Sequence, residues 1–271
     1  MPVRLNEDAD VVRMIREGLK AKGGYCPCRL ARTPENKCMC REFRDQIADP
    51  DFEGYCHCLL YYKFKEESKP YRAAFIGNSL TLHGKCDYWW NELGMAATDK
   101  AFDYVTLVTE GLKEKKCKVE SARVNLAVWE TAGKGRSPEQ PALDALLSSA
   151  PDLIVLQLSE NVSDTVGFRE DYEALLRSLQ ARCPNAQIVA CDDFWSEEKS
   201  AMKKAAAEAC GVLFADFSAL RAHPETYQCG LGTTVLGDDG VPHTVEHPGV
   251  AAHPGNAGMK AIAEIILGMI P

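Results

Sequence analysis

The chain has 271 residues, of which 46% are hydrophobic and 26% are charged, with a net charge of −8 and an isoelectric point near 5.4. This length accommodates two domains, and the acidic balance argues against nucleic acid or an anionic membrane as the main partner. The first 20 residues lack the apolar centre of a signal peptide, and no run approaches the ~20 apolar residues of a membrane span. We therefore expect a cytoplasmic protein.

The first predicted domain comprises residues 1–66 and begins with a helix. Asn6 or Asp8 stands where a side chain caps such a helix. After it come cysteine-rich loops and short helices. The charged stretch 63–70 is typical of a linker, and the second predicted domain comprises residues 67–271.

Six cysteines of the first domain form three pairs, each with one residue between its members. The pairs are Cys26 and Cys28, Cys38 and Cys40, and Cys56 and Cys58. In a reducing compartment such thiols are metal ligands or redox groups rather than structural disulfides. Few aliphatic residues separate them, so the segment needs a metal centre in order to fold.

Four thiolates suffice for a [4Fe–4S] cluster or a zinc ion. Zinc ligands favour wider spacing than these pairs offer, and two thiols are left over. Two spare thiols beside a cluster indicate a disulfide that the cluster reduces. A zinc site with two incidental cysteines is the alternative.

The combination of "CPCR" at 26–29, a second C-x-C pair and "CHCLLYY" at 56–62 resembles the catalytic chain of ferredoxin–thioredoxin reductase over essentially the whole first domain. The middle pair lies nearer the first pair than in the plant-type pattern. The resemblance implies a small helical domain with a [4Fe–4S] cluster. Its implied ligands are Cys26, Cys38, Cys40 and Cys56.

The same resemblance implies a redox disulfide between Cys28, as exposed nucleophile, and Cys58, as the sulfur that faces the cluster. His57 stands between two cysteines, where it protonates or stabilises a thiolate, unless it is only a surface histidine at a turn. The implied partners are a ferredoxin-like electron donor and a thioredoxin-like or small-molecule disulfide.

The second domain alternates apolar runs with amphipathic stretches. The runs cover residues 73–77, 118–126, 152–158, 186–193 and 212–217, and the stretches cover 99–115, 140–149, 167–182, 196–210 and 256–269. Such alternation predicts a five-stranded parallel sheet covered by helices on both faces. In such sheets, ligands bind beyond the carboxyl ends of the strands.

Three polar residues of the second domain fall near those ends. Ser79 follows the first strand, Asn161 follows the third, and His253 precedes the last helix. A histidine that removes a hydroxyl proton makes serine a nucleophile, and an asparagine amide stabilises the oxyanion. Ser79 taken alone is more typical of a helix cap, and it is the coincidence of the three residues that favours the catalytic interpretation.

The blocks "GNS" at 77–79, "SEN" at 159–161 and "HPGNAGM" at 253–259 resemble the SGNH (GDSL-like) hydrolases over about residues 70–271. The resemblance implies an α/β fold, a three-layer α/β/α sandwich, and a serine esterase or acyl hydrolase acting on a small ester. Ser159 replaces the usual glycine of the asparagine block. The oxyanion glycine of the second block is not evident, and an amide at residues 125–127 is the candidate substitute.

Val250 stands where the family has the aspartate that orients the histidine. Either a backbone carbonyl orients His253, or a carboxylate of Glu246, Asp239 or Glu130 does. Loss of the third member of such a triad commonly lowers the rate by orders of magnitude. The expected hydrolase is therefore slow or repurposed.

The tryptophans and the histidine-containing loop can each be interpreted either structurally or functionally. The four tryptophans line a substrate pocket or belong to the core, and the loop with His243 and His247 is a substrate flap or a solvated segment. The remaining cysteines are expected to be packed small residues: Cys86, Cys117, Cys183, Cys191, Cys210 and Cys229.

The predicted function joins a [4Fe–4S]-dependent disulfide reductase to a serine esterase of SGNH type. The alternative is a structural metal-binding interaction module joined to a non-catalytic SGNH-like binding domain.

Overall fold

A computed structural model describes residues 3–65, 69–116 and 118–271. The chain divides into two compact units, Met1–Ser68 and Lys69–Pro271. The predicted boundary between residues 66 and 67 lies outside the described residues, as does Cys117. Within these described ranges, no helix combines the length and the apolar character needed to cross a membrane.

The first unit combines helices with a small antiparallel sheet. Its elements are β1 (Val3–Leu5), α1 (Ala9–Ala21), η1 (Pro34–Asn36), α2 (Arg41–Ala48), β2 (Gly54–Tyr55) and β3 (Tyr61–Lys63). The side chain of Asp8 caps α1 by accepting from the amides of Asp10 and Val11. The sheet, in the order β1-β3-β2, was not predicted, because strands of two or three residues show no periodicity.

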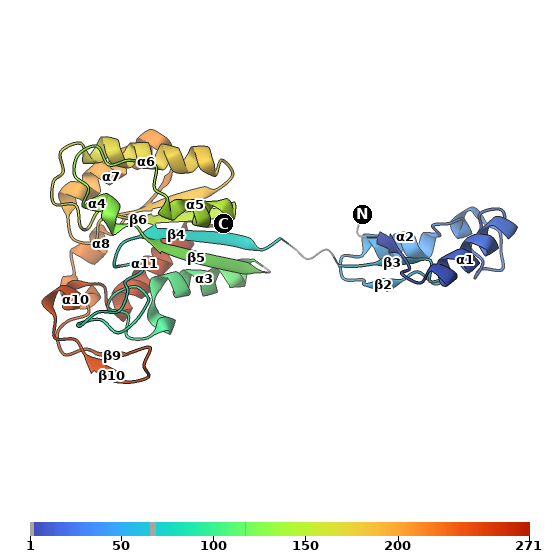
Figure 1. Cartoon of the computed structure of the whole chain (residues 1–271), viewed down its shortest axis with the longest axis horizontal. Coiled ribbons are helices and arrows are strands. Elements are labelled where there is room, and N and C mark those ends of the chain that lie inside the picture. The colour runs from blue at the N-terminus through green and yellow to red at the C-terminus, as the bar shows by residue number, and fades with distance from the viewer. Residues whose placement is uncertain (1–2, 66–68, 117) are drawn as a thin grey trace. The chain divides into compact units, whose positions relative to one another are not determined.

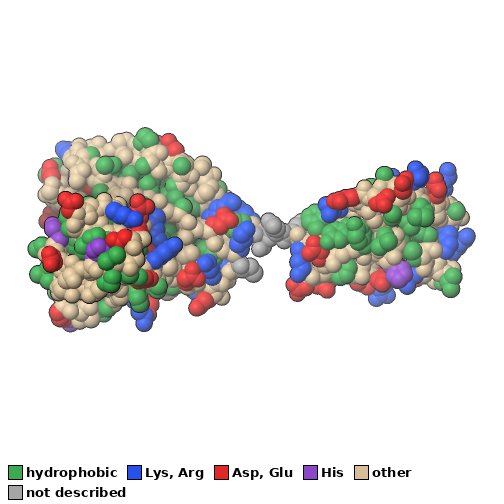
Figure 2. Space-filling view, turned by 60° about the horizontal axis from the view of Figure 1, so that its bottom comes forward, with side chains coloured by type: hydrophobic (Ala, Val, Ile, Leu, Met, Phe, Trp, Pro, Cys, Tyr) green, Lys and Arg blue, Asp and Glu red, His purple; other side chains and the backbone are tan. Residues whose placement is uncertain are grey.

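Thiols make up most of the core of this unit. Among residues 3–65, six hydrophobic residues are buried and four of them are cysteines; the six are Cys26, Cys40, Phe43, Cys56, Cys58 and Leu60. Other hydrophobic side chains of the unit are exposed, among them Met14, Leu30 and Leu59, and Figure 2 shows hydrophobic side chains gathered on its visible face. Partly buried side chains, such as Val12, Ile15 and Leu19 of α1, pack against this sulfur-rich cluster.

The second unit is built on the predicted five-stranded parallel sheet, in the order β5-β4-β6-β7-β8. Its strands are β4 (Tyr71–Gly77), β5 (Val119–Asn125), β6 (Leu153–Gln157), β7 (Gln187–Cys191) and β8 (Leu213–Ala215). Each lies almost entirely within one of the five apolar runs. All five residues of β6 are buried, and the four before Gln157 are apolar, which is typical of a strand covered on both faces.

Helices cover both faces of this sheet, which gives three layers (Figure 1). Successive residues of β4 point to opposite faces. Ala73 and Phe75 pack in the cluster that contains residues of α3 (Tyr104–Lys115) and α11 (Asn256–Gly268). Ala74 and Ile76 pack in the cluster that contains residues of α5 (Ala142–Ser148), α6 (Phe168–Arg182) and α7 (Glu197–Cys210).

Shorter elements surround the carboxyl ends of the strands. They are η2 (Lys100–Phe102), α4 (Ala127–Glu130), α8 (Ser218–Arg221), α9 (Pro224–Tyr227), β9 (Thr234–Leu236), β10 (Pro242–Thr244) and α10 (Pro248–Ala252). Strands β9 and β10 form an unpredicted antiparallel hairpin. Among the scattered cysteines, Cys183 and Cys191 are buried, and Cys86, Cys210 and Cys229 are half-buried.

Candidate functional site

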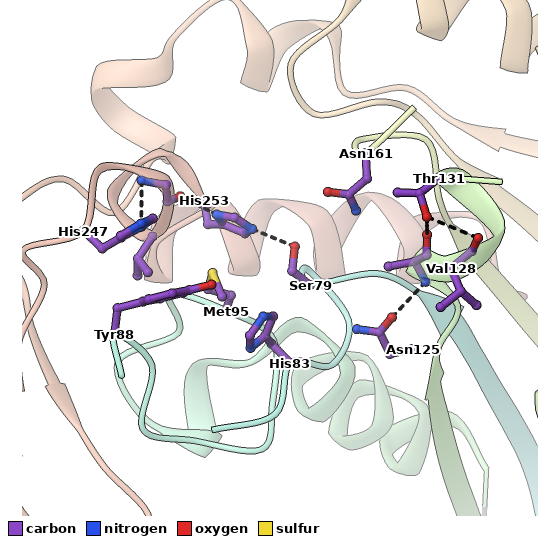
Figure 3. A pocket seen from close by; sticks show the side chains of 13 residues that line it. Ser79, His83, Tyr88, Met95, Asn125, Val128, Thr131, Asn161, His247 and His253 are labelled. Atoms are coloured by element: carbon purple, nitrogen blue, oxygen red, sulfur yellow. Dashed lines mark hydrogen bonds between the residues drawn. The ribbon is translucent and has the colours of Figure 1, made fainter. Parts of the chain in front are cut away.

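A cavity of about 420 Å³ opens where β4, β5 and β6 end. Ser79 lies two residues after β4, Asn161 lies four residues after β6, and His253 lies between α10 and α11. Figure 3 shows these three side chains around the same cavity. The structure thus brings together residues that are up to 174 positions apart in the sequence.

Gly77 lets the turn after β4 fold tightly enough to present Ser79. A Cβ atom at position 77 would lie 1.9 Å from the Thr81 hydroxyl oxygen and 2.8 Å from the Gln157 carbonyl oxygen. Thr81 in turn shares a hydrogen bond with the buried Tyr104 hydroxyl at 2.7 Å. The turn that carries Ser79 is therefore packed tightly against β6 and α3.

Ser79 and His253 form a hydrogen-bonded pair. The Ser79 Oγ atom lies 2.8 Å from His253 Nε2, and His253 Nδ1 lies 2.6 Å from the carbonyl oxygen of Gly249. A carbonyl only accepts hydrogen bonds, so Nδ1 carries the proton and Nε2 is the acceptor for the serine hydroxyl. This is the tautomer that a general base requires.

Of the groups considered for orienting His253, the backbone carbonyl is the one that contacts it. The side chain of Val250 is buried in the core. Asp239 pairs with His243 at 2.9 Å, and Glu130 bonds to Asn78 and Asn161. Glu246 is exposed.

The environment of His253 favours its neutral form. Desolvation by the surrounding protein lowers its pKa from 6.5 to about 4, although the hydrogen bond to the Gly249 carbonyl opposes this change. His83 and His247 also lower this pKa. A base of such low pKa is unprotonated at neutral pH but accepts a proton weakly.

Asn161 presents a side-chain amide to the cavity, while two of the backbone amides considered for the oxyanion already have partners. The Leu126 amide donates to the Gly77 carbonyl at 2.6 Å, and the Ala127 amide donates to the Asn125 side-chain oxygen at 2.8 Å. The amides at 126 and 127 therefore do not replace the missing glycine.

Aromatic and imidazole rings form one side of the cavity (Figure 3). Tyr88 stacks on His247 with ring centroids 4.2 Å apart. Within the part of the chain that the structure describes, none of the four tryptophans lines the cavity: Trp89 and Trp129 are buried, and Trp90 stacks on His243. Trp195 packs edge-on against His253 and donates to the Ala252 carbonyl.

Apart from Cys28, the predicted site residues of the first unit line a narrow hollow within that unit. Its lining includes five cysteines and His57; the cysteines are Cys26, Cys38, Cys40, Cys56 and Cys58. Cys28, the sixth, is exposed. Across residues 3–65, 69–116 and 118–271, no three His, Cys, Asp or Glu side chains converge closely enough to hold a single metal ion.

The sulfur atoms of Cys56 and Cys58 are 3.5 Å apart, and the Tyr61 amide donates to Cys56 at 3.3 Å. These hydrogen bonds lower the pKa of Cys56 to about 6, and the one with Cys58 has the largest effect. The same contact raises the pKa of Cys58. Partial desolvation raises the pKa of Cys28, so this thiol is not activated by its present surroundings.

No family model matches the chain, and no curated protein matches it. Several solved structures correspond to it loosely. A family two carbohydrate esterase from Clostridium thermocellum has 16% sequence identity, with 80% of this chain and 71% of that one covered and a TM-score of 0.45. A GDSL-like lipase from Bacteroides uniformis has 14% identity, with 74% and 95% covered and a TM-score of 0.47. An acetyl xylan esterase from Geobacillus stearothermophilus has 22% identity, with 73% and 93% covered and a TM-score of 0.41.

Proposed function

We propose that the second unit is a serine-dependent hydrolase of small esters, of the SGNH type that its sequence blocks resemble. The observation that carries this proposal is the 2.8 Å contact between Ser79 Oγ and His253 Nε2, in a cavity at the carboxyl ends of a parallel sheet. Asn161 adds an amide donor to the same cavity.

The proposed reaction follows from these contacts. His253 Nε2 takes the hydroxyl proton while Ser79 Oγ bonds to the ester carbonyl carbon, and the Asn161 amide stabilises the oxyanion. The proton then passes to the departing alcohol as the carbon–oxygen bond breaks. Water, deprotonated by the same histidine, releases the acid from the acyl-serine and restores the hydroxyl.

A fluorophosphonate probe tests whether Ser79 is activated. The probe phosphonylates serines that an adjacent base deprotonates, so peptide mass spectrometry should find it on Ser79 in the wild-type chain and not in His253→Ala. Labelling that is equal in both chains, or confined to other serines, would contradict the proposal.

The pH at which ester hydrolysis is lost in acid should lie well below the pKa of an ordinary histidine. The reaction needs neutral His253, whose pKa is lowered to about 4, so kcat/KM should fall only as pH drops through about 4 and stay level toward neutrality. A pH profile with an acid-stable aryl ester measures this limit. A midpoint near 6.5 would show that His253 is solvated as an ordinary histidine is.

For the first unit, we propose a [4Fe–4S] cluster and disulfide reduction. A cubane cluster binds each thiolate at a different iron, so its ligands surround it rather than converge on one point. Five cysteine side chains around one hollow, most of them buried, support this donor set more than a single zinc ion. The proposed ligands are Cys26, Cys38, Cys40 and Cys56, and the cluster, when bound, supplies single electrons.

In the proposed reduction, the thiols of Cys28 and Cys58 transfer two electrons and two protons to a substrate disulfide and become a disulfide themselves. A ferredoxin-like donor supplies two electrons, one at a time, and solvent supplies two protons, which together regenerate the two thiols. Cys28 is exposed, as the attacking thiol must be, and Cys58 is buried beside Cys56. His57 is exposed and lines the same hollow, where it can exchange protons with solvent.

A further inference from the structure

The carboxylate of Glu130 lies buried beneath the candidate esterase site, in contact with two of its loops. Glu130, the last residue of α4, is 1% exposed. Its Oε2 atom accepts from Asn161 Nδ2 at 2.6 Å. Its Oε1 atom accepts from the amides of Ser159 and Asn161 and from Asn78 Nδ2, at 2.5, 3.4 and 2.9 Å.

These contacts link the segment that carries Asn161 to the turn that carries the nucleophile. Asn78 immediately precedes Ser79 and is fully buried. Its Nδ2 atom also donates to Glu160 at 2.6 Å, so it lies between two carboxylates. Of these two carboxylates, Glu130 is the one bonded to both Asn78 and Asn161.

We infer that Glu130 is a positioning residue that fixes the Asn161 carboxamide for oxyanion stabilisation, an inference that rests on the proposed ester hydrolysis. The amide nitrogen of Asn161 has two hydrogens. One is held by Glu130, which sets the plane and rotation of the amide and leaves the other for the substrate oxygen.

The chemistry of the four contacts requires a carboxylate. All four partners are N–H donors, and an ionised carboxylate offers acceptor lone pairs on both oxygens. Burial raises the pKa of Glu130, and the hydrogen bonds from Asn161, Asn78 and the Ser159 amide oppose that rise. A glutamine of the same shape would keep one acceptor and place an NH₂ group against a donor.

Glu130→Gln is the direct test. With Oε1 retained toward Asn78 and Ser159, the glutamine NH₂ faces the Asn161 amide and turns it from its present orientation. We expect kcat for an aryl ester to fall about 10- to 100-fold, as for other supporting contacts, with little change in KM. Asn161→Ala should lower kcat by about 10²- to 10³-fold.

The double variant distinguishes positioning from general destabilisation. If Glu130 acts through Asn161, Glu130→Gln costs little further in the Asn161→Ala background. Glu160→Gln is the matched control, because Glu160 also accepts from Asn78 but is not bonded to Asn161. If Glu160→Gln lowers kcat, its fold-change and that of Asn161→Ala should multiply in the double variant, as expected for independent effects.

Circular dichroism and thermal melting establish whether each variant folds. If Glu130→Gln does not fold, Glu130→Asp, which keeps both acceptor oxygens, takes its place in the double-mutant cycle. The positioning role would be overturned if kcat were unchanged in Glu130→Gln. It would also be overturned if the fold-losses of Glu130→Gln and Asn161→Ala in kcat multiplied in the double variant. A wild-type chain that hydrolyses no ester would instead overturn the proposed function on which it rests.

Discussion

Replacing Ser79 with alanine is expected to lower kcat for a short-chain aryl ester by about 10⁴- to 10⁶-fold. Alanine lacks the oxygen that forms the acyl intermediate, and the 2.8 Å contact with His253 disappears with it. Ser79 is half-buried and alanine removes only one oxygen atom, so the fold should be retained. Initial rates with p-nitrophenyl acetate, measured on matched preparations, give the ratio.

Ser148→Ala is the matched control, because Ser148 is an exposed serine at the end of α5. Its kcat should equal that of the wild-type chain. Equal turnover in the wild-type and Ser79→Ala chains would assign the hydrolysis to another group. A wild-type chain without turnover would favour a binding domain instead.

Replacing Cys40 with serine is expected to remove iron and acid-labile sulfide from oxygen-protected protein and to unfold the first unit. Cys40 is buried, and four of the six buried hydrophobic residues of that core are cysteines. A core with so few aliphatic side chains depends on the bonds that its thiolates form. Metal analysis, visible absorption and limited proteolysis measure the loss.

Cys28→Ser separates cluster binding from electron transfer. This exposed thiol is a proposed redox group rather than a ligand, so its replacement should leave iron content and proteolytic resistance unchanged while disulfide reduction stops. Stoichiometric zinc in the wild-type chain would identify a structural metal-binding module. Full iron and sulfide in Cys40→Ser would remove that cysteine from the ligand set.

Much of the second unit was predictable because the hydrophobic pattern of the sequence indicates where its strands and helices lie. The five predicted runs correspond to β4 to β8; the signal is clearest for the inner strands β4, β6 and β7, since a strand buried on both faces has few polar residues. Position relative to those strands then placed Ser79, Asn161 and His253 at one edge of the sheet. The small sheet of the first unit and the hairpin of β9 and β10 carried no such signal, because each strand has only two or three residues.

The supporting contacts of the site were harder to predict than its reactive groups. Glu130 was considered as the partner of His253, whereas it bonds to Asn161 and Asn78. Sequence spacing does not show which of several loops a carboxylate on a short helix reaches. The Gly249 carbonyl has no sequence signature at all, since every residue has one; only the loss of the aspartate at position 250 pointed to such a group.

The contact between His253 and Gly249 spans only four residues of one chain segment. The His253 imidazole is thus oriented by a backbone carbonyl oxygen of the same segment, an atom that any amino acid would supply at position 249. That oxygen is kept whatever residue stands there, but a Cβ atom at position 249 would lie 2.9 Å from His247 Cε1, so the His247 ring would have to move. The same oxygen carries no net charge, so in the proposed reaction it would offer the imidazolium a dipole where a carboxylate would offer an anion, and we expect this to limit the rate.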